Sequence, residues 1–237
     1  MDKRIARIWE FYKRVNPLKC KTRTGWKDWG ITPENDIPVR GESMAEHSNS
    51  AAWLAFAIKS EFPDEYKNID IERVVTALNF HELDEATIPD FTPFSGITRE
   101  QKRALGNAAV AESASILSNG GELVKYINEF EDAKTANGKF ASMCDKLDAG
   151  LQCKIYEEAG LIPYNREPRT IERKHRITER GHKCLADSWL AHCVENYDFD
   201  PTFTKIATEL QVTRTEKLGE LVGALNAVKN KKSHEIN

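Results

Sequence analysis

The stretch that decides the fold runs from Asn79 to Asp90 and reads Asn-Phe-His-Glu-Leu-Asp-Glu-Ala-Thr-Ile-Pro-Asp. It places one histidine and four carboxylates within ten residues, directly after an apolar run that begins at Val74. If Asp70 caps a helix that continues to about residue 86, His81 and Glu85 share one helical face. Unpaired acidic side chains next to a buried apolar run would destabilise the fold, because burying a charge without a partner is unfavourable. A metal or catalytic site therefore competes with the simpler interpretation, which is a solvated acidic helix end.

Two further predicted helices bring more ligands. Ser43-Met44-Ala45-Glu46 has the spacing of a capping box, which predicts a helix from about residue 44 with His47 on its first turn. A helix from about Lys139 carries apolar residues at three-to-four spacing, with Asp145 and Asp148 among them.

One divalent cation would then draw its ligands from three helices. The candidate ligands are His47, His81, Glu82 and Asp145. Mixed nitrogen and oxygen ligation suits manganese, cobalt, iron, zinc or nickel better than calcium, and magnesium is a further candidate.

Several blocks of the sequence resemble, in order, those of the HD-domain metal-dependent phosphohydrolases, whose signature is a histidine, a His-Asp pair and a distant aspartate. The blocks are Arg23-Thr24-Gly25-Trp26, Glu42 through Ser48, His81-Glu82-x-x-Glu85, Pro89-Asp90-x-Thr92-Pro93, and Lys139 through Asp145. They cover about residues 1 to 160 and look most like the 5'-deoxynucleotidase-like branch. The resemblance implies an all-α HD-domain helical bundle with a single metal site. It also implies hydrolysis of (deoxy)nucleoside 5'-monophosphates to nucleoside and phosphate.

The same resemblance suggests roles for residues around the site. Arg23 would hold the phosphate, while Trp26 and Arg40, from a long loop between Lys19 and Glu42, would face the nucleotide. A surface arginine and a core tryptophan are the alternative interpretation. Glu85 would orient or deprotonate the attacking water, and Asp90 would meet the sugar hydroxyl or assist proton transfer.

The chain departs from the signature at Glu82, which stands where the family has aspartate. The extra methylene moves the carboxylate oxygens by about 1.5 Å, which is large against a tolerance of about 0.2 Å in metal–ligand distances. The helix could sit back, the carboxylate could bind in another mode, or the site could be weakened. A non-catalytic nucleotide-binding protein therefore stays open as an alternative.

Particular residues of this chain favour or disfavour other classes of HD-domain enzyme. A deoxynucleoside triphosphate triphosphohydrolase, which would release inorganic triphosphate, is the main enzymatic alternative. Guanosine-tetraphosphate hydrolases carry the motif His-Asp-x-x-Glu-Asp. This chain has Ala86 after Glu85, where that motif has aspartate, which disfavours this class of enzyme. Two-metal HD enzymes need additional histidines, whereas this chain has none between His81 and His175.

Length predicts one domain of about 200 residues with a tail. With the resemblance, this implies an HD-domain core over residues 1–211, followed by a C-terminal helix and tail over residues 212–237. Helical spacing predicts further helices over residues 3–15, 98–117, 123–130 and 201–210, and no strand. The basic segment 169–183 is interleaved with glutamates, which favours a solvated helix.

The net charge of −3 argues against a general nucleic-acid partner. Since no apolar run approaches the roughly 18 residues that span a bilayer, we expect no membrane association. Five scattered cysteines indicate reduced thiols and a cytoplasmic location. The expected partner is a nucleotide. The resemblance also implies a homodimer. An apolar stripe within Glu216–Val228 would dock either on the core of the same chain or on the second subunit.

Overall fold

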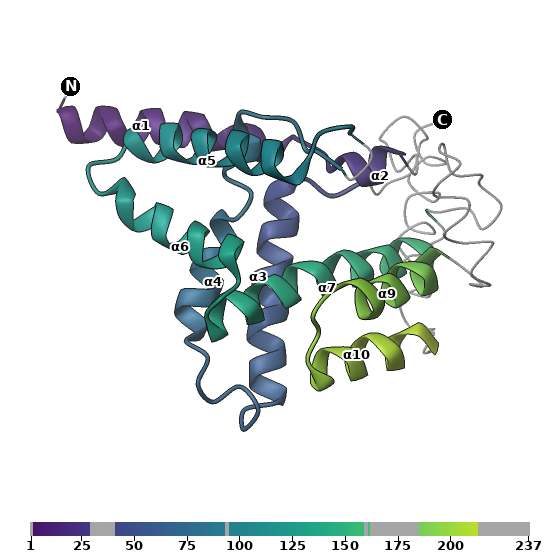
Figure 1. Cartoon of the computed structure of the whole chain (residues 1–237). Coiled ribbons are helices and arrows are strands. Elements are labelled where there is room, and N and C mark those ends of the chain that lie inside the picture. Colours follow the sequence, from purple (N-terminus) through teal and green to yellow (C-terminus); the bar gives the residue numbers. More distant parts are fainter. Residues whose placement is uncertain (1, 29–40, 93–94, 159–160, 162–184, 213–237) are drawn as a thin grey trace, which may run out of the picture.

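The computed structural model describes residues 2–28, 41–92, 95–158, 161 and 185–212 (Figure 1). In chain order its helices are α1 (Lys3–Val15), the 3-10 helix η1 (Asn16–Lys19), α2 (Thr24–Asp28), α3 (Met44–Glu61), α4 (Ile71–Phe80), the 3-10 helix η3 (Asp84–Ala86), α5 (Arg99–Ser115), α6 (Gly120–Asp132), α7 (Ala136–Glu158), α9 (Leu185–Asn196) and α10 (Pro201–Val212). The described residues form no strand, and an isolated bridge pairs Thr22 with Ser43. The prediction of an all-α protein is confirmed.

Side-chain caps explain where the main helices begin. Ser43 Oγ accepts from the backbone N–H of Glu46, and the Glu46 carboxylate accepts from the Ser43 N–H at 2.7 Å. Thr98 forms the same capping box at the start of α5, and Asp70 caps α4 by accepting from the Arg73 N–H at 3.1 Å. Because each such cap contributes about 1 kcal/mol, these local signals fix the helix starts that the sequence predicted.

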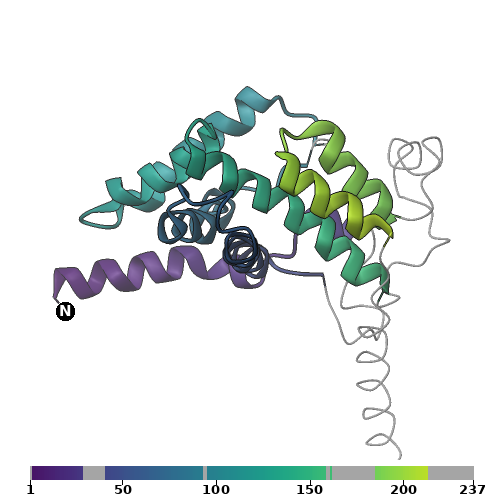
Figure 2. The same ribbon diagram turned by 90° about the horizontal axis from the view of Figure 1, so that it is seen from below.

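The main core lies where α3 and α7 cross, with α4 on one side and α9 and α10 on the other (Figures 1 and 2). Alanines on α3 let the neighbouring helices approach closely; these are Ala51, Ala52 and Ala55. The ring centroid of Phe140 lies 4.6 Å from that of Tyr66 and 5.6 Å from that of Phe203. Since burial of one such ring contributes about 1.5–3 kcal/mol, this aromatic cluster holds α7 and α10 together.

The helix predicted to run from Asp70 to about residue 86 is shorter than expected. α4 ends at Phe80, and the chain then turns through His81 to Leu83 before η3. The imidazole Nδ1 of His81 lies 2.6 Å from the carbonyl oxygen of Leu78, and the Lys21 ammonium donates to the carbonyls of Glu85 and Ile88. The proposed pairing of His81 with Glu85 on one helical face is therefore wrong, although both residues still lie at the site.

Several predictions fall outside the described residues or need correction. The expected loop from Lys19 to Glu42 begins where η1 ends and contains the short helix α2. Its residues 29–40, including Arg40, lie outside the described part of the chain. The basic segment 169–183 and the apolar stripe after residue 215 also lie outside it, and so does the predicted tail beyond Val212.

The described surface includes one apolar helix face. Ile5, Ile8 and Trp9 of α1 are each more than half exposed. Among the described helices, none is both long and apolar enough to cross a bilayer.

Candidate metal centre and its cavity

Four side chains from three segments converge between α3, α4 and α7. His47 lies on the first turn of α3, His81 and Glu82 directly follow α4, and Asp145 lies on α7. His47 is completely buried, and the other three expose little of their surface. The structure therefore brings together the four residues that the sequence proposed as metal ligands.

The ligand atoms of His47, His81 and Glu82 lie within 4.8 Å of one another, close enough to share one cation, and Asp145 lies beside both histidines. His47 Nε2 lies 2.9 Å from Asp145 Oδ1 and 3.7 Å from Glu82 Oε1. His81 Nε2 lies 3.4 Å from Glu82 Oε1 and 3.6 Å from Asp145 Oδ1. Ligands about 2.1 Å from one ion lie about 3.0–3.4 Å apart, depending on the coordination geometry. Despite its extra methylene, the Glu82 carboxylate reaches the cluster.

The hydrogen bonding of His81 gives an independent test of that fit. Its Nδ1 faces the Leu78 carbonyl, which can only accept, so the ring hydrogen lies on Nδ1. Nε2 is buried and has no hydrogen-bond partner in the described structure. It faces two carboxylates, and a lone pair in that position needs a positive partner, either a metal ion or a second proton. Without a metal, Glu82 and Asp145 outweigh the effect of burial and raise the pKa of His81 well above its ordinary value.

His47 is oriented by a residue to which the sequence analysis gave no role. Asp148 Oδ2 lies 2.7 Å from His47 Nδ1, and both side chains are buried. A carboxylate on one ring nitrogen turns the other toward the ligand cluster, as is common for metal-binding histidines. Asp148 stands one helical turn after Asp145, which is the signal that could have revealed its role.

A second group of donors, formed by Glu42, His47 and Asp148, is less suited to a cation. Arg23 Nη1 lies 3.2 Å from Glu42 Oε1 and 3.0 Å from His47 Nδ1, so a guanidinium already supplies the positive charge there. Burial lowers the pKa of Arg23, but the surrounding carboxylates outweigh it and keep the side chain charged.

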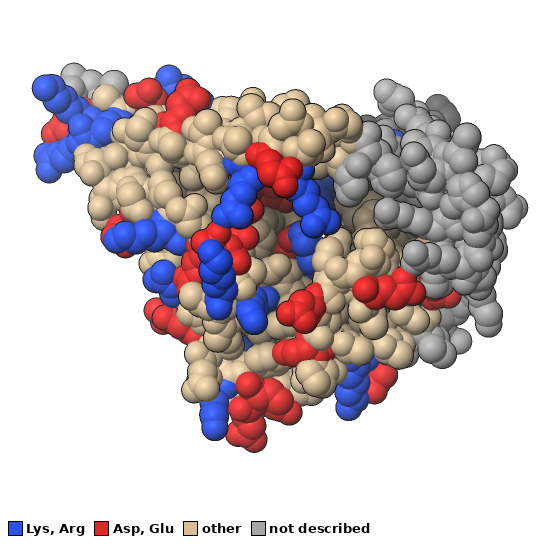
Figure 3. Space-filling view, in the orientation of Figure 1, with Lys and Arg blue, Asp and Glu red and all other residues tan. Residues whose placement is uncertain are grey.

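The ligand cluster opens into a cavity of about 720 Å³. Figure 3 shows this face hollowed near its centre, with Lys and Arg side chains around the hollow. The basic side chains that line the cavity are Arg23, Arg99, Lys102 and Lys146. Lys146 Nζ lies 2.6 Å from Asp145 Oδ2, and Lys102 Nζ donates to the Phe91 carbonyl. The lining also includes the acids Asp84 and Glu131, so the cavity joins a metal-binding end to walls of mixed charge with four cationic groups that an anion can meet.

Glu85 and Asp90, the proposed catalytic residues, both line the cavity. Burial, with the nearby charges of Glu82 and Asp90, raises the pKa of Glu85 to about 10. Asp90 Oδ2 accepts from the backbone N–H of Thr24 at 2.7 Å, so this carboxylate also holds the start of α2.

Trp26 belongs to the cavity wall and to the core at once. Its side chain is 1% exposed, and its Nε1–H donates to Glu42 Oε1 at 2.8 Å. Its ring packs on Trp189 of α9, a cavity-lining residue that the sequence analysis missed. Sequence spacing gave no functional signal on α9, because that helix carries no charge cluster or ligand pair.

Comparisons with known proteins agree with this geometry. A model of the HD domain matches residues 15–185. The 5'-deoxynucleotidase HDDC2 of Dictyostelium discoideum is 30% identical over 172 residues, covering 71% of this chain and 83% of that protein. The 5'-deoxynucleotidase HDDC2 of Homo sapiens is 26% identical over 151 residues, covering 63% and 68% of the two chains.

Solved structures share the fold. The PH0347 protein from Pyrococcus horikoshii OT3 has a TM-score of 0.60 at 20% identity, over 90% of this chain and 98% of that one. A structure titled as a predicted metal-dependent phosphohydrolase from Magnetospirillum magnetotacticum MS-1 has a TM-score of 0.59 at 22% identity, over 89% and 94%.

Fold and site together define a class, namely an all-helical protein with a buried histidine–carboxylate cluster suited to one divalent cation. The chain belongs to the HD-domain family.

Proposed function

We propose that the chain is a metal-dependent phosphohydrolase that removes the 5'-phosphate from (deoxy)nucleoside monophosphates. One observation carries the proposal, namely a donor cluster that opens into a cavity large enough for a nucleotide. His47, His81 and Glu82 hold ligand atoms within 4.8 Å of one another, with Asp145 beside both histidines, and four Lys and Arg side chains line the cavity. The relatives named 5'-deoxynucleotidase support the same reaction.

The chemistry divides between the cation and the protein. The divalent ion that His47, His81, Glu82 and Asp145 would hold supplies a Lewis acid and lowers the pKa of water. We assign Arg23 to the phosphoryl oxygens, because its planar guanidinium stays charged and lines the cavity beside His47.

Two acids that follow α4, Glu85 in η3 and Asp90 just beyond it, are placed to transfer protons. Glu85 is buried against the cavity, where its carboxylate is placed to orient the attacking water or to accept its proton. Asp90, on the same wall, is placed to meet the sugar hydroxyl or the departing 5'-oxygen.

The test is a phosphate-release screen combined with metal analysis of the purified protein. Deoxynucleoside mono- and triphosphates are incubated with manganese, cobalt or magnesium, and the products are identified. We expect orthophosphate from monophosphates, and we expect His47→Ala to abolish it. Inorganic triphosphate would identify a triphosphohydrolase, and nucleotide binding without turnover would identify a non-catalytic protein. Phosphate release that survives His47→Ala would remove the proposed site.

We further propose a homodimer in a reducing, cytoplasmic compartment, with an HD-domain core that ends at residue 211. The exposed apolar face of α1 supports an interface, because such patches mark interaction surfaces. Cys144 and Cys193 are buried and form no disulfide, which supports a reducing compartment. Light scattering coupled to size exclusion tests the dimer.

A further inference from the structure

One face of α9 lines the cavity from end to end. Its cavity-lining residues recur at helical spacing; they are Leu185, Ser188, Trp189, His192 and Asn196. Residues three, four and seven apart lie on one face of a helix, so this stripe is a continuous wall. The family model ends at residue 185, so nearly all of the wall lies beyond the stretch that this model matches.

Trp189 is the broad surface in this wall. Its indole is half-buried and packs on Trp26, with ring centroids 5.0 Å apart and planes inclined by 33°. Trp26 is itself fixed by its hydrogen bond to Glu42 and by an edge contact with Tyr156 at 5.1 Å. An aromatic ring supported from behind has little freedom to lose when another flat ring packs against it.

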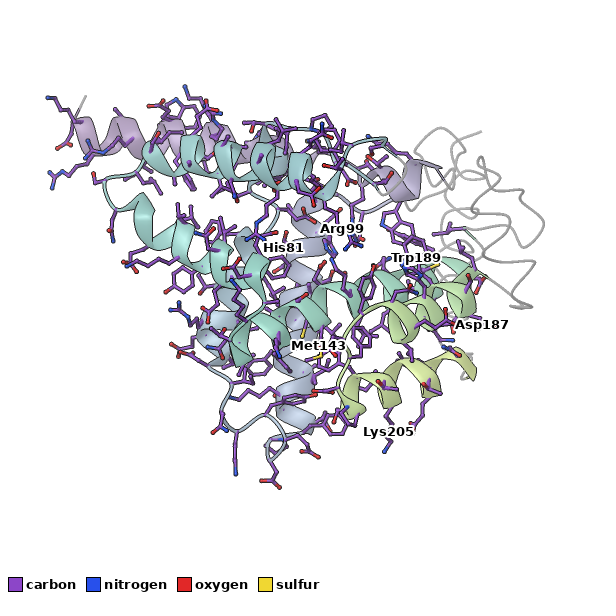
Figure 4. All side chains as sticks on the ribbon, in the orientation of Figure 1. His81, Arg99, Met143, Asp187, Trp189 and Lys205 are labelled. Atoms are coloured by element: carbon purple, nitrogen blue, oxygen red, sulfur yellow. The ribbon has the colours of Figure 1, made fainter. Side chains whose placement is uncertain are left out.

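The position of Trp189 matches the place where the organic part of a substrate must lie. Figure 4 shows Arg99 between His81 and Trp189 in projection, and all three line the same cavity. Ala149 continues the lining from the ligand helix α7 toward α9. A phosphate held near His81 would therefore leave its sugar and base to extend toward Trp189.

We propose that the cavity-facing side of α9 is the base-binding wall of the substrate site, with Trp189 as the stacking platform. The proposal rests on the nucleotidase function proposed above. Every nucleobase has a planar π-face, so stacking on Trp189 suits nucleotides as a class. On the same wall, the Asn196 amide donates to His192 Nδ1 at 2.8 Å, which orients that imidazole as a polar group beside the platform.

The test compares a substrate that has a base with one that lacks it. For Trp189→Leu, we expect KM for deoxynucleoside monophosphates to rise on the order of tenfold, because base–aromatic stacking contributes about 1–3 kcal/mol. KM for 2-deoxyribose 5-phosphate should stay unchanged. Trp189→Phe should restore most of the affinity, and Trp53→Leu, which removes an exposed tryptophan on α3, is the matched control.

The outcomes separate this inference from the proposed function. An equal rise in KM for both substrates, or no rise for either, would overturn the platform while leaving the hydrolase intact. If the leucine variant folds poorly, the wild-type protein decides, since similar KM values for the two substrates would exclude base binding.

If the wild type releases no phosphate from any monophosphate, the nucleotidase proposal fails first. Quenching of tryptophan fluorescence by deoxyadenosine monophosphate then still tests the platform. Quenching that persists in Trp53→Leu and disappears in Trp189→Phe supports it, and quenching that persists in both variants overturns it.

Discussion

Asp148→Asn is the sharpest test of the metal centre, because it changes one charge and almost no volume. Asp148 Oδ2 lies 2.7 Å from His47 Nδ1, and the two side chains are 6% and 0% exposed. Asparagine keeps a carbonyl oxygen that can accept from Nδ1–H. The substitution therefore preserves the hydrogen bond and removes its charge.

The expected loss follows from that change. A hydrogen bond to a charged group contributes about 1.5–3 kcal/mol, against about 0.5–1.5 kcal/mol for a neutral one. The difference of about 1–1.5 kcal/mol corresponds to roughly tenfold in an equilibrium constant. It falls at the lower end of the 10–100-fold effects typical of residues that orient metal ligands. We expect Mn²⁺ to bind about tenfold more weakly.

Manganese binding is measured by electron paramagnetic resonance on chelator-treated protein, and phosphate release is followed against free Mn²⁺. Saturating manganese should recover most of the activity of Asp148→Asn. Asp64→Asn, an exposed aspartate after α3, is the control and should match the wild type. Wild-type manganese affinity in Asp148→Asn would show that Asp148 does not orient a ligand.

Four further outcomes follow from the same geometry. Glu82→Asp should keep metal binding and activity, whereas Glu82→Ala should reduce both more than 100-fold. Metal analysis and initial rates measure these effects, and unchanged activity in Glu82→Ala would remove Glu82 from the site. Unfolded Glu85 ionises near 4.5 but the folded residue only at a pKa of about 10, so stability falls as pH rises between these values. Glu85→Gln should therefore raise the Tm of metal-free protein more at pH 8.5 than at pH 5 while lowering activity, and an equal Tm gain at both pH values contradicts this. Manganese at about 100 times its Kd should stabilise the fold by about 2.7 kcal/mol in denaturant titrations, an effect that His47→Ala should remove. Phe203→Ala should cost about 3–5 kcal/mol in the same assay without changing the manganese Kd, because that ring is completely buried in the first turn of α10 and packs in the main core rather than against the ligand cluster.

Helix starts could be predicted from the sequence because their causes are local. Ser43, Asp70 and Thr98 each cap a backbone N–H three residues away, so the whole signal lies within four letters. The convergence of His47, His81, Glu82 and Asp145 could be anticipated because local helix signals combined with a family pattern, and their role as metal ligands stays a prediction.

The end of α4 could not be predicted because its cause is distant. Lys21 contacts the carbonyls of Glu85 and Ile88 from more than sixty residues away, and these bonds hold the turn and η3. The cavity-lining role of α9 could not be predicted from the sequence for a related reason. Trp189 acquires its place through packing on Trp26, and no spacing within either segment encodes that contact.

Gly150 lets α7 and α9 pack closely together. A Cβ at this position would lie 2.8 Å from Leu190 Cδ2 and 3.7 Å from Cys193 Sγ, so either the Leu190 side chain or α9 itself would have to shift. Asp145 lies on α7, and Trp189 lies on α9 next to Leu190. The separation between the metal-binding end of the cavity and its aromatic wall therefore depends on a residue without a side chain, and Gly150→Ala would probe that dependence without changing any group placed against the nucleotide.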